Sequence, residues 1–92
     1  MKIKICGIDY EVCYRTNEEM SGHLGLADFN GQKISINSNH TKQTQEIALI
    51  HEILHIVSDS YGLNLSEHQV KILTHGLISV YKDNSNIFHD FN

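Results

Sequence analysis

The sequence predicts a single α+β domain, in which a small antiparallel sheet of two hairpins packs against two main helices. Residues 2–15 and 24–38 alternate apolar and polar side chains around glycine-containing turns, which is typical of β-hairpins. Residues 42–60 and 67–82 instead repeat apolar side chains at helical spacing and follow good capping residues. The whole chain, residues 1–92, has the length of one domain with a modest core.

The first predicted hairpin, residues 2–15, turns at the dipeptide Gly7-Ile8. A two-residue turn at this place puts Ile3 opposite Val12 on one strand face. The apolar residues of both strands then share that face, so we expect it to pack on the core.

The second predicted hairpin, residues 24–38, turns at Asn30-Gly31, because both residues tolerate positive φ. Its second strand, residues 32–37, leads directly into the first helix. This register gives one apolar face, formed by Gly25, Ala27, Phe29, Ile34 and Ile36.

The first helix is predicted from about Lys42 to Ser60, with Asn39 or Thr41 as its N-cap and Gly62 just past its C-terminus. Its apolar side chains surround the axis almost completely, so we expect the helix to be buried at the centre of the domain.

The second helix is predicted to begin at Glu67, because Ser66 and Gln69 form a capping box. The run that starts at Asp83 ends it. Its apolar stripe consists of Val70, Leu73, Leu77, Val80 and Tyr81. Beyond the helix, residues 87–88 are apolar and are expected to pack back on the core.

Residues 51–55, within the first helix, read His-Glu-Ile-Leu-His and match the H-E-x-x-H motif. Residues four apart lie about 40° apart around a helix axis and one turn apart along it, so His51 and His55 can reach one metal ion. Glu52 projects beside them, near the place of a metal-bound water. The spacing therefore predicts His51 and His55 as zinc ligands and Glu52 as a general base. The alternative is a core helix whose histidines are satisfied by hydrogen bonds.

A third protein ligand is expected, because a catalytic zinc ion usually has three of them and one water. The extended metzincin motif would place a histidine six residues after His55, but that position is Tyr61. Gluzincins take a glutamate from the following helix, and Glu67 has this position. The nearby His68 and His75 are the other candidates. If the helices run antiparallel through a short loop, a rise of 1.5 Å per residue puts His75 nearer than Glu67 to the height of the motif.

Residues 24–84 resemble the small phage and prophage zincin-like proteins, which are distantly similar to the ImmA/IrrE metallopeptidases. The shared pattern is a strand, then H-E-x-x-H, then a short loop, a glutamate that opens the next helix, and an apolar helix that ends near Asp-Asn. The resemblance implies a minimal zincin-like fold in which His51, His55 and Glu67 bind zinc and Glu52 is the base. It also implies a phage or host regulatory protein as the substrate.

These residues predict a zinc-dependent metallopeptidase that hydrolyses peptide bonds, with Glu67 as the third ligand and His75 as the alternative. If Glu67 binds zinc, His75 or Tyr61 is a candidate donor to the oxyanion. If residues 32–37 lie at a sheet edge, an extended substrate can pair with them. The rival function is a zinc-stabilised binding or regulatory module without turnover, closed by a fourth ligand such as His68 or His75. A third alternative is an interaction protein without metal.

The composition limits the classes of binding partner and the cellular compartment that we expect for this protein. A net charge of −4 and the lack of a basic patch argue against nucleic acid. No apolar run approaches the roughly 20 residues of a membrane span, and residues 1–10 lack the apolar core of a signal peptide. Cys6 and Cys13 would lie roughly 13 Å apart in the first hairpin, too far for a disulfide. Free thiols favour a cytoplasmic protein, and the sequence does not indicate an oligomeric state.

Overall fold

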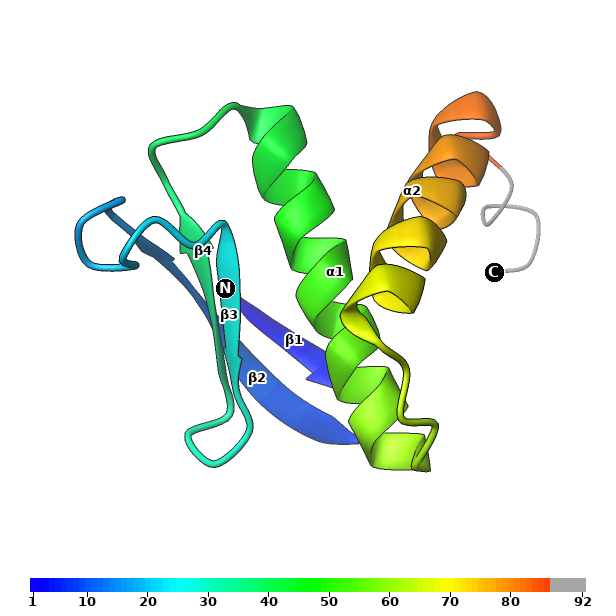
Figure 1. The fold of residues 1–92 in the computed structure, drawn as a ribbon, viewed down its shortest axis with the longest axis horizontal. Helices are drawn as coiled ribbons and strands as arrows, with labels where there is room; N and C mark the ends of the chain where they lie inside the picture. Colours follow the sequence, from blue (N-terminus) through cyan, green and yellow to red (C-terminus); the bar gives the residue numbers. More distant parts are fainter. Residues whose placement is uncertain (87–92) are drawn as a thin grey trace.

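A sheet, helix α1 and helix α2 form three successive layers in the computed structural model, which describes residues 1–86 (Figure 1). The elements are β1 (Lys2–Ile5), β2 (Ile8–Arg15), β3 (Gly25–Asp28), β4 (Lys33–Asn37), α1 (Lys42–Tyr61) and α2 (Glu67–Asp83). The α+β class and the two main helices are therefore confirmed. Helix α1 packs across the sheet, whereas α2 packs on α1 and not on the strands. The packing predicted for residues 87–88 lies outside the described residues.

The sheet is mixed and has the strand order β1-β2-β4-β3. Each predicted hairpin forms an antiparallel pair, and the parallel pairing of β2 with β4 joins them. Nothing within either hairpin specifies how the two should join, so the sequence did not predict this pairing. Because β4 lies inside the sheet, residues 32–37 are not free to pair with a substrate. Strands β1 and β3 form the two edges instead.

The first hairpin turns one residue earlier than predicted, at Cys6-Gly7, so Ile3 pairs with Tyr10 and not with Val12. Both turn residues have positive φ, 50° and 82°, as a type I′ turn requires. The pairing differs from the prediction by two residues, which leaves every side chain on its expected face. Tyr10 and Val12 are accordingly buried.

The second hairpin has the predicted register, with Ala27 opposite Ile34. Its loop differs, because the positive φ of 54° falls at Gln32 and not at the predicted dipeptide. Gly31 is needed for space instead: its N–H donates to Asp28 Oδ1 at 2.9 Å, and a Cβ there would collide with the other oxygen of that carboxylate.

The core lies between the sheet and α1. It consists of Ile5, Tyr10, Val12, Ile34, Ile36, Ala48 and Ile56. The motif residues His51, Glu52 and His55 are only half-buried, so α1 is less enclosed than its apolar sequence predicted. One side of the helix centre is therefore open to a pocket.

The predicted helix caps are present at three ends. Thr41 accepts a hydrogen bond from the backbone N–H of Thr44 at the start of α1, and Gly62 adopts φ 67° just past its end. Ser66 and Gln69 form the capping box of α2. Neither helix of the described residues is both long and apolar enough to cross a membrane.

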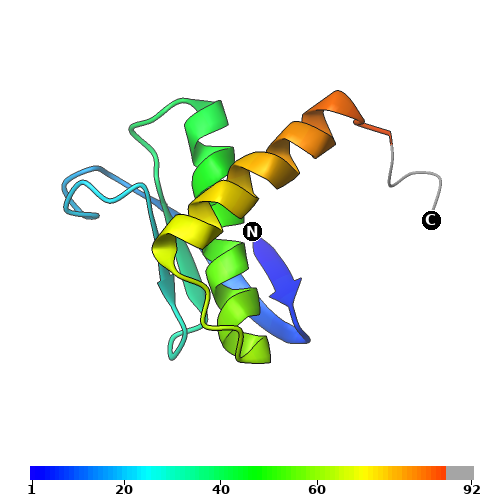
Figure 2. The same cartoon turned by 45° about the vertical axis from the view of Figure 1, so that its right-hand side comes forward.

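Helix α2 crosses α1 obliquely, and its C-terminal half leads away from the sheet (Figure 2). Of its predicted apolar stripe, Val70 is buried, but Leu77, Val80 and Tyr81 are 50–57% exposed. These three side chains line an apolar groove of about 510 Å³ between the helices. The apolar stripe therefore packs on α1 at the N-terminal end of α2. At the C-terminal end of α2 its side chains are exposed in the groove.

Candidate metal centre

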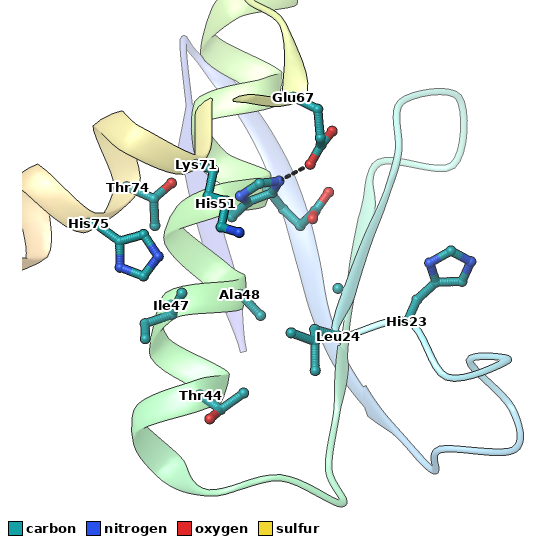
Figure 3. Close-up of a pocket in the computed structure, with 12 residues that line it drawn as sticks. His23, Leu24, Thr44, Ile47, Ala48, His51, Glu67, Lys71, Thr74 and His75 are labelled. Atoms are coloured by element: carbon teal, nitrogen blue, oxygen red, sulfur yellow. Dashed lines mark hydrogen bonds and ion pairs between the residues drawn. The ribbon is translucent and has the colours of Figure 1, made fainter. Parts of the chain in front are cut away.

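Three side chains from two helices converge beside the middle of α1. His51 and His55 lie one turn apart, and their Nε2 atoms are 3.2 Å from each other. Glu67, the first residue of α2, contacts both rings. One carboxylate oxygen pairs with His51 Nε2 (Figure 3), and the other lies 2.9 Å from His55 Nε2. One ligand atom from each residue lies within 4.8 Å of the others, so the group can hold a metal ion.

The contacts within this group favour a cation over a set of hydrogen bonds. An ionised carboxylate only accepts, so each Nε2 that contacts Glu67 would have to donate a proton. The two donors of His51 and His55 would then face each other across 3.2 Å. A cation between the three groups removes this conflict, because both imidazoles then present lone pairs to it. Tetrahedral zinc ligands at 2.0–2.1 Å lie about 3.3 Å from each other, close to the separation of the two Nε2 atoms.

Glu67 reaches the histidines because the connection between the helices climbs back along α1 (Figure 1). After the turn at Gly62, the N–H of Leu65 donates to Ser58 Oγ at 2.9 Å, which holds the loop at the height of Ser58. Ser66 is extended and carries the chain on to Glu67, so the loop gains height along α1 before α2 begins. The height argument that favoured His75 is wrong, because it gave the loop no rise.

The other predicted candidates stay outside the group. His68 and His75 are exposed on α2, and neither belongs to the cluster of possible ligands. Tyr61 is 70% exposed at the end of α1 and does not line the pocket beside the cluster. In the described part of the chain, the cluster thus has three members and no fourth side chain closes it.

Glu52 lies beside the cluster without joining it. Its side chain is half-buried between α1 and β3, where a Cβ on Gly25 would lie 3.2 Å from Glu52 Oε2. Burial raises the pKa of the Glu52 carboxyl above its ordinary value, and the nearby charges of His51 and His55 offset this effect only in part. A carboxylate with a raised pKa accepts a proton more readily, which suits a general base.

Glu67 has the opposite shift. Partial desolvation acts to raise the pKa of its carboxyl, but the hydrogen bond from His51 and the charge of His55 together lower it below its ordinary value. Its side chain is 74% exposed, so solvent reaches the carboxylate. Glu67 is therefore ionised at neutral pH, as a metal ligand must be.

A pocket of about 490 Å³ opens beside the cluster, between β3, α1 and α2 (Figure 3). Leu24, Ile47 and Ala48 contribute apolar surface to it. Polar groups of the pocket come from His23, Thr44, His51, Glu52, Glu67, Lys71, Thr74 and His75. The candidate metal site thus faces a space that can admit part of a ligand.

Lys71 and Gly25 are among the pocket residues that had no predicted role in the site. Lys71 could have been found, because Glu67, Lys71 and His75 recur at every fourth position and so share one face of α2. Gly25 could not, since only the sheet brings this residue against Glu52.

Comparisons with protein-family models, curated proteins and solved structures gave no match. The resemblance to zincin-like proteins of the ImmA/IrrE type, and the regulatory substrate that it implies, therefore stay predictions from the motif.

Proposed function

We propose that this protein is a zinc-dependent metallopeptidase that hydrolyses peptide bonds. One observation carries the proposal: the two histidines of H-E-x-x-H meet a glutamate of the next helix, while Glu52 lies beside them in the same pocket. Among the described residues no fourth side chain completes the cluster, which leaves a coordination position for water. This arrangement supports an enzyme over the rival, a zinc-stabilised module with closed coordination.

Zinc is the metal that the ligand atoms favour. Two of the three candidate ligands are imidazole nitrogens, from His51 and His55. Magnesium and calcium prefer oxygen ligands, whereas imidazole suits zinc and other transition metals. Zinc is also the metal expected for H-E-x-x-H on a helix.

Glu52 carries out the proton transfers of the proposed hydrolysis. A bound zinc ion would polarise the scissile carbonyl and lower the pKa of a water molecule. Glu52 takes a proton from that water while the water oxygen forms a bond to the carbonyl carbon. Glu52 then gives the proton to the amine nitrogen as the C–N bond breaks. The raised pKa of the Glu52 carboxyl favours its acceptance of the proton.

Strand β3 supplies a place for the substrate backbone. It pairs with β4 on one side and forms a sheet edge on the other, next to Glu52. An extended peptide can add to such an edge through main-chain hydrogen bonds. A peptide in this position would run past the cluster of His51, His55 and Glu67.

The decisive experiment compares the wild type with Glu52→Gln, which keeps the shape of the side chain and removes the base. Zinc-loaded proteins are incubated with a peptide library, and the products are identified by mass spectrometry. We expect Glu52→Gln to retain its zinc and its fold while the cleavage rate falls roughly 10²-fold or more. Glu18→Gln, at an exposed glutamate distant in sequence, is the matched control.

Equal cleavage by wild type and Glu52→Gln would contradict the role of Glu52. If a fully zinc-loaded wild type cleaved no peptide of the library, the binding module without turnover would be the better explanation.

A further inference from the structure

One wall of the pocket beside the cluster carries a cation without a partner. Lys71 follows Glu67 by one turn of α2, and its side chain lines the pocket together with those of His51 and Glu67 (Figure 3). Lys4 and Lys82 form ion pairs, but among the described residues the Lys71 ammonium forms none. The pocket therefore contains a positive charge that no side chain of this part of the chain neutralises.

Two further donors lie around the same space. His75 is one turn beyond Lys71 on α2, and His23 lies across the pocket on the segment before β3 (Figure 3). A neutral imidazole donates one hydrogen bond and a protonated one donates two. Between these walls lie the apolar side chains of Leu24 and Ala48, which add contact surface for a ligand.

The charges of the pocket favour an anion once a divalent cation is bound. The carboxylates of Glu52 and Glu67 then balance the two positive charges of the ion. Lys71 remains in excess, and its exposed ammonium is then available to a ligand. A carboxylate forms a charge-assisted hydrogen bond with it.

We propose that this pocket recognises a carboxylate of the peptide substrate, close to the scissile bond, through Lys71 with His75 and His23 as neighbouring donors. The inference rests on the proposed function for naming a peptide as the ligand. Lys71 is one helical turn, about 5.4 Å, from Glu67, and an extended peptide covers this distance in about two residues. The carboxylate belongs to an Asp or Glu side chain or to the C-terminus of the peptide, since both present the same oxygens.

Binding of short peptides tests the pocket without turnover. The protein is zinc-loaded Glu52→Gln, and affinities are measured by NMR titration at low ionic strength. One pair of doubly blocked alanine peptides carries Glu or Gln at the same position, which tests a side-chain carboxylate. A second pair of tetra-alanine peptides ends in a free carboxylate or an amide, which tests a C-terminal one. We expect the carboxylate member of at least one pair to bind about fivefold more tightly, and added salt to reduce the difference.

Substitution of Lys71 assigns the preference to this residue. In the same Glu52→Gln background, Lys71→Met should bind both members of a pair equally. Lys2→Met removes the same charge from the opposite edge of the sheet, so it should keep the preference. Both lysines are exposed, so neither change removes core packing.

Three results would overturn the inference: no peptide binding, equal binding within both pairs, or a carboxylate preference that survives Lys71→Met. None of them decides the proposed function, which depends on turnover by the wild type and its loss in Glu52→Gln. Conversely, carboxylate binding that depends on Lys71 in a protein without turnover would overturn the proposed function alone.

Discussion

The side chain of Glu52 lies against the backbone of Gly25: a Cβ on this glycine would lie 3.1 Å from Glu52 Cγ and 3.2 Å from Oε2. The first residue belongs to α1 and the second to the edge strand β3. Gly25 does not have a positive φ, so a side chain at this position is opposed by the space that Glu52 occupies and not by backbone conformation. The proposed base is thus fixed by the strand that would receive the substrate.

Gly25→Ala should impair cleavage without removing zinc. The added Cβ has to push Glu52 away, and none of its three nearest atoms belongs to His51, His55 or Glu67. Because a small misplacement of a catalytic group is costly, we expect kcat/KM to fall about tenfold to a hundredfold at unchanged zinc content. Gly76→Ala is the control: a Cβ there meets nothing within 4 Å, and alanine in a helix should stabilise the protein by about 0.5–1 kcal/mol. A normal rate for Gly25→Ala would show that Glu52 adapts.

Zinc affinity should distinguish Glu67 from its rivals on α2. Glu67→Ala removes a ligand atom from the cluster, so we expect the Kd for zinc to rise by about a hundredfold or more. His68→Ala and His75→Ala change exposed residues outside the cluster and should leave it unchanged. Competition with a chromophoric chelator measures all three. Loss of affinity in His75→Ala with a normal Glu67→Ala would mean that the third ligand is His75.

Ser58→Ala should loosen the loop that carries Glu67. Ser58 is 5% exposed, and its hydroxyl accepts the hydrogen bond of the Leu65 N–H. Without this acceptor we expect the free energy of unfolding of the metal-free protein to fall by about 1–3 kcal/mol, measured by urea denaturation. Zinc affinity should fall as well, because Glu67 is less well placed. Ser60→Ala, at an exposed position two residues on, should affect neither quantity.

The raised pKa of Glu52 makes a prediction about pH and stability in the metal-free protein. A carboxyl with a raised pKa in the folded state contributes stability below its ordinary value of 4.5, and this contribution is lost as the pH rises through the folded value. The ionised side chain therefore costs stability at neutral pH. We expect Glu52→Gln to have a higher Tm than the wild type at pH 7, with the difference closing below about pH 4.

Thermal melts across this pH range provide the measurement, with Glu18→Gln as the control at an exposed site. A difference between wild type and Glu52→Gln that is the same at every pH would show that shape, and not charge, causes it.

The sequence by itself determined the features that depend on neighbouring residues. The cap of α1 at Thr41, its end at Gly62 and the capping box at Ser66 each involve residues within a few positions. The register of the second hairpin is local as well. The shared face of His51 and His55 follows from helical geometry alone.

Only the tertiary structure decided which distant groups meet. The parallel pairing of β2 with β4 made β3 an edge strand and brought Gly25 against Glu52. The rise of the loop between the helices brought Glu67, and not His75, to the two histidines. Local spacing fixes the direction of a side chain on its own element. The separation between elements depends on packing and on the path of the loops, which short-range patterns do not encode.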